Sequence, residues 1–286
     1  MFKTAVRQLR WTVLKPEFSV CVIIGAMGYI FDLVRYVKFS VYLGEPMNVI
    51  EPFIASSSNY VTVTISVFSL LFLLSDLPYN AADDNFTLLR MSRRRWLCSK
   101  IIYMLSTCAL YYLVIAVLTF ISAVPFAFVS NEWSGPIEKM CFEDPFLSVD
   151  LFGISYYAPE VVTHFLPIQA LLHSYALVTL YSMALCMLLL SLKLLIYHQY
   201  ISLSAVYIIH ALGYLPMLVI MGTRPFSLFA GALLTYHSFT AEKVNASQTI
   251  CESYIAFALI IVAAFILSNI LITARKFRGG GSASEQ

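Results

Sequence analysis

Apolar and polar residues follow each other along this chain in long blocks. Apolar runs of about 18 residues or more lie near 18–42, 60–77, 101–128, 168–192, 202–221 and 251–274. Helices of this length can cross a hydrocarbon core of ~30 Å. Stretches such as SMALCMLLLSLKLLIY lack the alternation of apolar and polar residues that transmembrane β-strands show. The pattern predicts an all-α polytopic membrane protein with six transmembrane helices.

The composition supports the same class of protein. Of the 286 residues, 60% are hydrophobic and only 12% are charged, whereas about a quarter are charged in soluble domains. The first apolar run is too long for a signal peptide and contains Asp32, Arg35 and Lys38, so we expect it to remain in the mature protein. Residues 17–278 form the predicted membrane domain, and GGGSASEQ at 279–286 is typical of a flexible tail or linker.

The basic residues are distributed unequally between the predicted loops. If the N-terminus is cytoplasmic, 13 of the 18 Lys and Arg residues fall in cytoplasmic segments and 3 in loops on the opposite side. An excess of Lys and Arg is typical of cytoplasmic loops. We therefore predict a multi-pass protein of the cytoplasmic (plasma) membrane with both termini in the cytoplasm. The charge follows this topology and does not indicate binding of nucleic acid.

Three segments outside the spans have a structure of their own in this prediction. Residues 1–16 predict an amphipathic helix in the cytoplasmic headgroups, with Phe2, Val6, Leu9 and Val13 on its apolar face and Pro16 at its end. The loop 129–167 is long enough for an outer subdomain. The apolar segment 226–236 would reach only ~16 Å as a helix, about half of a span, and predicts a re-entrant or interfacial segment on the outer side.

The stretch SDLPYNAADDNFTLLRMSRRRWLCSK, residues 75–100, separates the second and third apolar runs. Asp83 and Asp84 favour the start of a short helix, and Ser92 can cap the next one. The apolar residues of the short helix, which do not share one face, are Phe86, Leu88, Leu89 and Met91. A membrane covers only one side of a helix, so this pattern predicts docking into a groove of a partner. A simpler interpretation assigns 90–100 to the positive-inside signal, with Trp96 as an interface anchor.

The sequence resembles a known family at this point. An N-terminal elbow helix, six spans, a structured basic loop after the second span and a half-length apolar segment before the sixth resemble the membrane subunit of ABC transporters of the type-2 exporter class. SDLPYNAADDNFTLLRMSRRRWL is similar to permeases of Gram-positive bacteria whose ATPase is a separate chain. The resemblance covers residues 1 to about 278 in architecture, and its residue-level part is short.

The resemblance implies a role for the cytoplasmic loop 76–100. Residues 83–91 would form a coupling helix seated in a cleft of an ABC ATP-binding subunit, and a second permease copy or homologue would complete a homo- or heterodimer. The residues assigned to ATPase coupling are Asp83, Asp84, Phe86, Leu88, Leu89, Arg90, Met91, Arg93 and Arg94. The chain has no G-x-x-x-x-G-K-[ST] loop, so we expect it to bind no cofactor itself, with ATP and Mg on the partner ATPase. The expected substrate is hydrophobic or amphipathic, with a peptide as one candidate.

Ionisable residues inside the apolar runs are candidates for a translocation path, because such residues are costly in a membrane. Asp32, Arg35 and Lys38 lie three residues apart and so share one side of the first span. They form either an Asp32–Arg35 pair with Lys38 reaching the outer headgroups or the polar lining of an exit pathway. His173 and His210, in the fourth and fifth spans, are either hydrogen-bonded between helices or part of a proton relay.

Cysteines add one further prediction. Cys141 and Cys251 are the only cysteines expected on the outer side, where an oxidising environment allows a disulfide worth about 2–4 kcal/mol. Two free thiols are the alternative if that surface is reducing. No Cys and His spacing of the metal-binding type occurs, so we expect no metal site.

Other functions fit parts of the sequence. The transmembrane coupling subunit of an energy-coupling-factor importer also docks ATPases, but usually by two coupling helices, and one is recognisable here. A membrane-embedded lipid-modifying enzyme or a sensor subunit is a further alternative, because the Asp83–Asp84 pair can hold Mg²⁺. No combination of nucleophile, base and oxyanion donor can be assembled, so we do not expect an enzyme.

Overall fold

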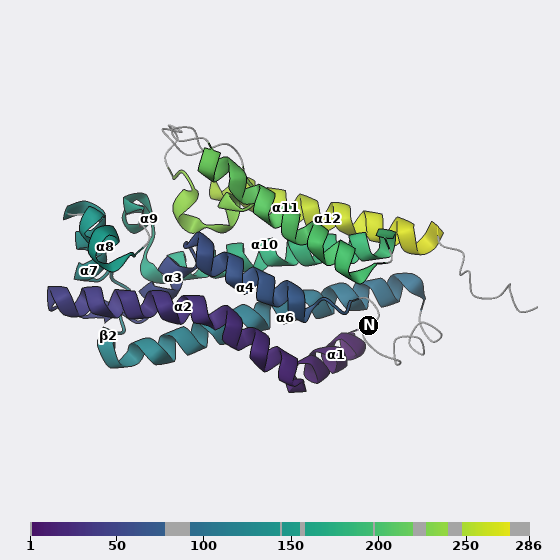
Figure 1. Cartoon of the computed structure of the whole chain (residues 1–286), viewed down its shortest axis with the longest axis horizontal. Helices are drawn as coiled ribbons and strands as arrows, with labels where there is room; N and C mark the ends of the chain where they lie inside the picture. Colours follow the sequence, from purple (N-terminus) through teal and green to yellow (C-terminus); the bar gives the residue numbers. More distant parts are fainter. Residues whose placement is uncertain are drawn as a thin grey trace, which may run out of the picture.

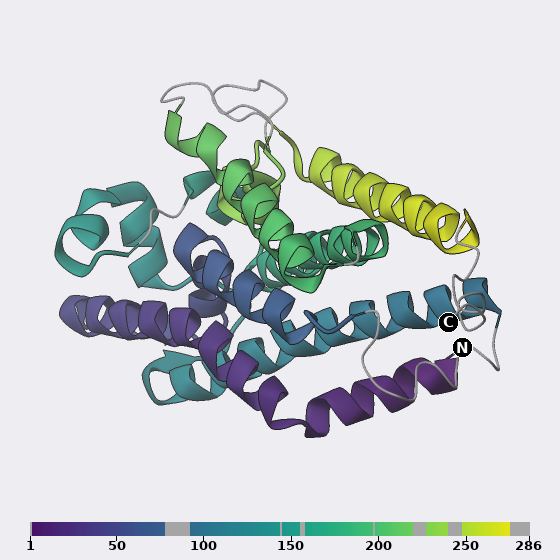
Figure 2. The ribbon, with the colours of Figure 1, turned by 45° about the vertical axis from the view of Figure 1, so that its right-hand side comes forward.

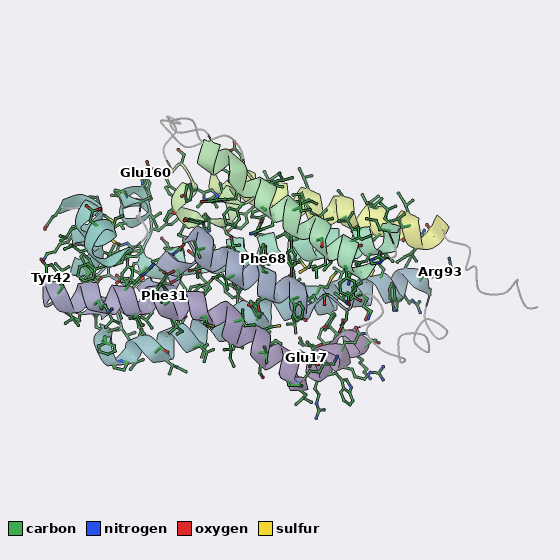
Figure 3. All side chains as sticks on the ribbon, in the orientation of Figure 1. Glu17, Phe31, Tyr42, Phe68, Arg93 and Glu160 are labelled. Atoms are coloured by element: carbon green, nitrogen blue, oxygen red, sulfur yellow. The ribbon has the colours of Figure 1, made fainter. Side chains whose placement is uncertain are left out.

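The computed structural model describes residues 2–77, 92–143, 145–154, 158–196, 198–219, 227–239 and 248–274. Its long helices run along the longest axis of the molecule (Figure 1). Arg93 lies toward one end, here called the basic end, and Tyr42 at the opposite end, which also carries α7, α8 and α9 (Figures 1 and 3). The elements are α1 (Phe2–Leu14), α2 (Pro16–Leu43), β1 (Met47–Asn48), α3 (Glu51–Ser56), α4 (Tyr60–Leu73), α6 (Arg93–Ala123), η1 (Val124–Phe126), β2 (Ala127–Phe128), α7 (Gly135–Glu138), η2 (Lys139–Glu143), α8 (Pro145–Phe152), α9 (Pro159–His164), α10 (Pro167–Ile196), α11 (Gln199–Val219), η3 (Ala230–Ala232), η4 (Leu234–Tyr236) and α12 (Ile250–Ala274).

Four helices of the described residues are long and apolar enough to cross a membrane. They are Pro16–Leu43, Arg93–Phe126, Pro167–Ile196 and Ile250–Thr273. Helix α11 has 21 residues, which corresponds to ~32 Å, and α4 has 14 residues, which corresponds to only ~21 Å. The structure therefore confirms a mostly helical protein with membrane-spanning character, and six spans remain a prediction.

One helix boundary differs from the sequence prediction and another agrees with it. Helix α4 ends at Leu73, although the apolar run continues to Leu77, and turns follow it. Ser75 and Asp76 interrupt the apolar residues there, and such side chains favour turns over the interior of a helix. Helix α6 begins at Arg93, directly after Ser92, where the sequence predicts that a new helix starts and leads into the third span. Ser92 occupies its N-cap position without a side-chain capping hydrogen bond.

The core between α2, α4 and α6 contains tyrosines whose hydroxyl groups are bonded to other helices. The hydroxyl of Tyr111 donates to the carbonyl of Ser66 at 3.1 Å, and that of Tyr112 lies 2.8 Å from the hydroxyl of Ser182. Both tyrosines are fully buried. Helix α2 comes close to this layer at Gly25, where an added Cβ would overlap the Tyr111 hydroxyl. A small residue on α2 is therefore required for this packing.

Helix α1 packs on the part of α6 near the basic end (Figure 2). The hydroxyls of Thr12 and Tyr103 lie 2.7 Å apart, and Ala5 is buried on the same contact. The face toward the bundle therefore includes Ala5, Thr12 and the partly buried Leu9, which packs against the core. Of the apolar face expected from the sequence, Phe2, Val6 and Val13 stay exposed. The helix ends at Leu14 before Pro16, as the sequence predicts.

The loop expected to form an outer subdomain contains α7, the π-helix η2, α8 and α9. Its apolar side chains Ile137, Met140 and Val161 are buried and belong to the same core as the long helices. A short parallel pairing joins it to the segment after α2, with Met47 opposite Ala127 and Asn48 opposite Phe128. The subdomain is thus tied to the bundle on its α2 side.

The segment expected to be re-entrant is described from residue 227 to 239. It forms two 3-10 turns, η3 and η4, instead of a spanning helix. The ring of His237 lies 2.8 Å from the hydroxyl of Ser253 on α12 and 3.2 Å from the carbonyl of Leu234. Burial lowers the pKa of His237 to about 4, so the ring is neutral at physiological pH. The turns are held to α12 by an uncharged histidine.

The Gly25 contact predicts a measurable coupling. Gly25→Ala should lower the thermal unfolding midpoint in detergent, with a cost of about 1–3 kcal/mol, because overpacking a filled core forces side chains to move. The added methyl group meets the Tyr111 hydroxyl first. The penalty should therefore be smaller when Gly25→Ala is introduced into Tyr111→Phe, as a double-mutant cycle measures. Equal penalties in both backgrounds would show that this contact does not limit the packing.

Candidate functional site

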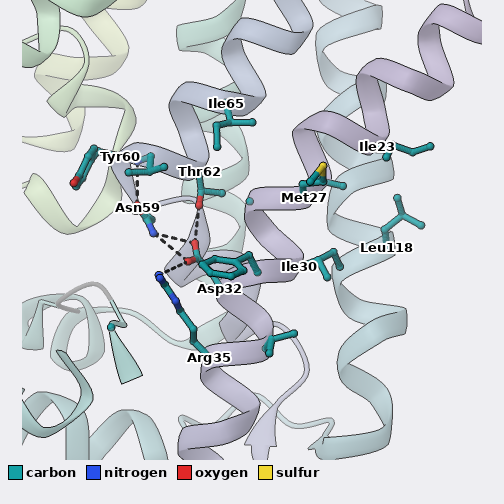
Figure 4. Close-up of a pocket in the computed structure, with 16 residues that line it drawn as sticks. Ile23, Met27, Ile30, Asp32, Arg35, Asn59, Tyr60, Thr62, Ile65 and Leu118 are labelled. Atoms are coloured by element: carbon teal, nitrogen blue, oxygen red, sulfur yellow. Dashed lines mark hydrogen bonds and ion pairs between the residues drawn. The ribbon is translucent and has the colours of Figure 1, made fainter. Parts of the chain in front are cut away.

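A groove of about 900 Å³ runs along α2 and α4 (Figure 4). Leu118 of α6 and Gly153, which follows α8, complete its lining. Its apolar wall includes Ile23, Met27, Ile30, Phe31 and Ile65, and its polar groups include Asp32, Arg35, Asn59 and Thr62. The groove thus combines a long apolar wall with one group of polar side chains, which is the chemistry of an amphipathic binding site.

Asp32 is the centre of the polar group. Its carboxylate accepts hydrogen bonds from Thr62 Oγ1 at 2.6 Å and from Asn59 Nδ2 at 3.0 and 3.2 Å. A buried carboxylate needs such donors to offset the loss of water. The donors come from α4, so the network joins α2 to α4 across the floor of the groove.

Asn59 has this position because it begins α4. Its side-chain oxygen accepts a hydrogen bond from the backbone N–H of Val61 at 3.0 Å, which makes it the N-cap of the helix. The same amide group then directs its Nδ2 toward Asp32. One side chain therefore both starts α4 and fixes the carboxylate, and the position of the site depends on where the helix begins.

Arg35 completes the polar group from the next turn of α2. Its Nη1 lies 3.5 Å from Asp32 Oδ1, the pair that the three-residue spacing predicts. The guanidinium lies over the ring of Phe31, 4.3 Å from its centre. Gly153 has a φ of +62° and lies above this guanidinium, with an added Cβ only 3.7 Å from Arg35 Cζ. The charge is thus held in place by stacking on one helix and by the turn after α8.

The two predicted histidines lie apart from this group and are hydrogen-bonded between helices. His210 Nδ1 lies 2.7 Å from the hydroxyl of Tyr181, and its Nε2 lies 3.2 Å from Thr64 Oγ1. His173 Nδ1 lies 3.0 Å from the hydroxyl of Tyr254. None of these partners is a carboxylate. The geometry agrees with the interhelical interpretation of both residues.

The predicted coupling residues are described only in part. Asp83, Asp84, Phe86, Leu88, Leu89, Arg90 and Met91 lie outside the described residues. Arg93 and Arg94 form the first turn of α6. Arg93 Nη1 donates to the carbonyl of Ile272 near the end of α12 at 3.0 Å, whereas Arg94 is exposed. Arg93 therefore joins the start of α6 to α12.

The predicted disulfide is not formed. No disulfide joins Cys141 to Cys251 in the structure. Cys141 is buried in η2, whereas Cys251 is exposed in the first turn of α12. Burial raises the pKa of the Cys141 thiol to about 12, and only a thiolate reacts in disulfide exchange. The sequence predicted that both cysteines lie on the same side of the membrane, but the burial of Cys141 depends on the packing of η2.

Glu51 is a buried acid that the sequence prediction missed. It begins α3 and is fully buried, with Oε1 accepting from the backbone N–H of Ser134 at 2.7 Å. Its Oε2 accepts from the Ser134 hydroxyl at 2.6 Å and from the Asn48 N–H at 2.9 Å. Burial raises the pKa of Glu51 to about 7 despite these donors. The carboxyl group therefore titrates within the physiological range while it holds α7 to α3.

Asn48 strengthens the same junction. Its Nδ2 donates to the carbonyls of Ser130 at 2.7 Å and Glu132 at 3.0 Å. Together with Glu51 it forms what we call the clasp between the segment after α2 and the loop 129–167. Glu51 stands in the short sequence NVIEPF, where Pro52 marks the start of a helix. The partner Ser134 is 83 residues away, so no local pattern indicates the contact.

Comparisons with protein-family models, with curated proteins and with solved structures gave no match for this chain. Within the described ranges, no group of three or more His, Cys, Asp or Glu side chains is placed to hold a metal ion. Function is therefore inferred from the residues and their geometry alone.

The clasp predicts a dependence of stability on pH. The pKa of Glu51 is raised from its ordinary value of 4.5 to about 7, so the folded protein binds this proton more tightly than the unfolded chain does. Stability should therefore fall as the pH rises from about 4.5 to about 7, by on the order of a few kcal/mol. Thermal unfolding in detergent at a series of pH values measures it, and Glu51→Gln should remove this part of the slope.

Glu45→Gln provides the matched control, because Glu45 is a partly exposed carboxylate of the same region that pairs with Lys139 on the surface. We expect this variant to keep the dependence of the unfolding midpoint on pH. A slope that persists in Glu51→Gln would assign the titration to another group.

Proposed function

We propose that this chain is the membrane subunit of an ATP-driven ABC exporter in the cytoplasmic membrane. It would move a hydrophobic or amphipathic substrate, with a peptide as one candidate, and would be coupled to a separate ATP-binding subunit that holds ATP and Mg. A second copy or a homologue would complete the transporter. The proposal includes six spans and both termini in the cytoplasm.

The observation that carries the proposal is the contact between Arg93 and Ile272. Arg93 is the first helical residue after the loop that resembles a coupling segment, and it donates to a carbonyl in the last turns of α12. A cation at the carboxyl end of a helix is favoured by the helix dipole. A displacement of the loop would therefore act on α6 and α12 together, as mechanical coupling to a partner requires.

The exposed apolar side chains of α1 also support a membrane subunit of this type. Phe2 is 69% exposed and Val6 is 45% exposed, although both lie on a helix that packs on α6. Apolar side chains on the free face of a basic amphipathic helix can insert among lipid headgroups. This arrangement suits an elbow helix at the cytoplasmic surface.

The coupling helix can be tested by truncating its apolar side chains. Leu88→Ala with Leu89→Ala should leave the protein inserted and folded but remove the ATP-binding subunit, because each buried leucine contributes about 1.5–3 kcal/mol. The ATPase activity that co-purifies with the tagged chain from native membranes measures this loss. Leu259→Ala with Leu267→Ala is the matched control, since both leucines are exposed on α12.

Two results would contradict the proposal. The first is a wild-type chain that purifies from native membranes without any ATP-hydrolysing subunit. The second is a Leu88 and Leu89 double variant that keeps both the subunit and its activity, which would leave the loop with a topogenic role alone.

The proposed topology can be tested by cysteine labelling of intact cells. Val129→Cys should react with an impermeant thiol reagent, because Val129 is 83% exposed in the loop assigned to the outside. Arg94→Cys should react only after the membrane is opened. Both variants are made with Cys251→Ser, since Cys251 is an exposed thiol itself. Labelling of Arg94→Cys alone in intact cells would reverse the orientation.

A further inference from the structure

The groove between α2 and α4 has the dimensions of one lipid leaflet. Its wall extends from Ile23 to Arg35 of α2, and the twelve residue steps between them correspond to ~18 Å along the helix. Half of a hydrocarbon core measures ~15 Å. If the hydrocarbon core of the membrane begins near Phe18, Arg35 lies ~26 Å farther along the helix, close to the outer headgroups. The polar end of the groove is therefore near the outer surface and the apolar wall extends inward.

Arg35 has hydrogen-bonding capacity beyond its ion pair. A guanidinium group has five N–H donors, and in the described part of the chain Arg35 forms one ion pair, to Asp32 at 3.5 Å. Its side chain is 34% exposed and lines the groove. The carboxylate of Asp32, in contrast, already accepts from Asn59 and Thr62. The polar group of the groove thus offers a ligand N–H donors but few free acceptors. This arrangement favours the binding of an anion.

We propose that this groove binds a phospholipid of the outer leaflet. Its phosphate would accept hydrogen bonds from Arg35, whose planar guanidinium suits the geometry of a phosphate. One acyl chain would lie along Phe31, Met27 and Ile23, which are 60%, 63% and 61% exposed. The stack on Phe31 holds the guanidinium in place before the lipid arrives. The site is independent of any ATPase, and the inference rests on the proposed function only for the orientation of the chain, which makes this leaflet the outer one.

The first experiment varies the phosphate. The detergent-solubilised full chain is titrated with phosphatidylglycerol and with diacylglycerol of the same acyl chains, and native mass spectrometry counts the bound lipid. We expect the wild type to bind phosphatidylglycerol about tenfold more tightly, because a hydrogen bond to a charged group is worth this factor or more. Arg35→Gln should remove this preference and leave the binding of diacylglycerol unchanged. Lys38→Gln, an exposed cation one turn farther along α2, should retain the preference.

The second experiment fills the space along the apolar wall of the groove. Ile23→Trp places a ring in the groove and should reduce the affinity for both lipids about fivefold or more, since the volume for the chain is lost. Ile24→Trp is the matched control, because Ile24 is also exposed but does not line the groove. Soluble glycerol phosphate should fail to displace phosphatidylglycerol, which distinguishes a lipid site from a site for free phosphate.

Three results would overturn the inference. Equal binding of phosphatidylglycerol by Arg35→Gln and the wild type would show that Arg35 does not recognise the phosphate and that lipids contact the groove without specificity. Displacement by glycerol phosphate alone would indicate an anion site without a lipid. A wild-type dimer that dissociates in Ile23→Trp, with lipid binding unchanged, would assign the groove to a second copy of this chain.

Discussion

Water is absent where helices pack within a hydrocarbon core, so each polar group there has to find its partner on the protein. This constraint explains the contacts on which the bundle depends. Tyr111 bonds to a carbonyl of α4, and His210 bonds to α10 and α4 through its two ring nitrogens. Asp32 accepts hydrogen bonds from both Asn59 and Thr62. These hydrogen bonds are directional, so they set which helices are neighbours and in which register, whereas apolar packing alone is less selective.

The groove follows from the same constraint. Because Asp32 accepts hydrogen bonds from residues at the start of α4, that helix begins beside the second half of α2, and the two helices enclose an apolar wall that extends from the polar group. Gly28 allows the close approach, since an added Cβ would lie 3.1 Å from the Cα of Thr62. The network that stabilises the helix pair is therefore also the polar end of the proposed lipid site.

The two ends of the molecule are held together by different contacts. At one end Asn48 and Glu51 form the clasp between the segment after α2 and the loop 129–167, and this contact contains a carboxyl group with a pKa of about 7. At the basic end Arg93 connects α6 with α12. The helices are therefore linked by hydrogen bonds at both ends of the bundle. This property would suit a subunit driven by a partner, as we propose.

Much of the helical structure was determined by the sequence alone. The apolar runs at 18–42, 168–192 and 251–274 became α2, α10 and α12 within a few residues, because a long run of apolar residues has no alternative to a helix in lipid. The Asp32–Arg35 pair followed from helical spacing, and Pro16 ended α1. Only the tertiary structure decided the rest. Asp32 and its partner Asn59 are 27 positions apart, Glu51 and its partner Ser134 are 83 positions apart, and the burial of Cys141 depends on packing, so a local pattern carries no information about them.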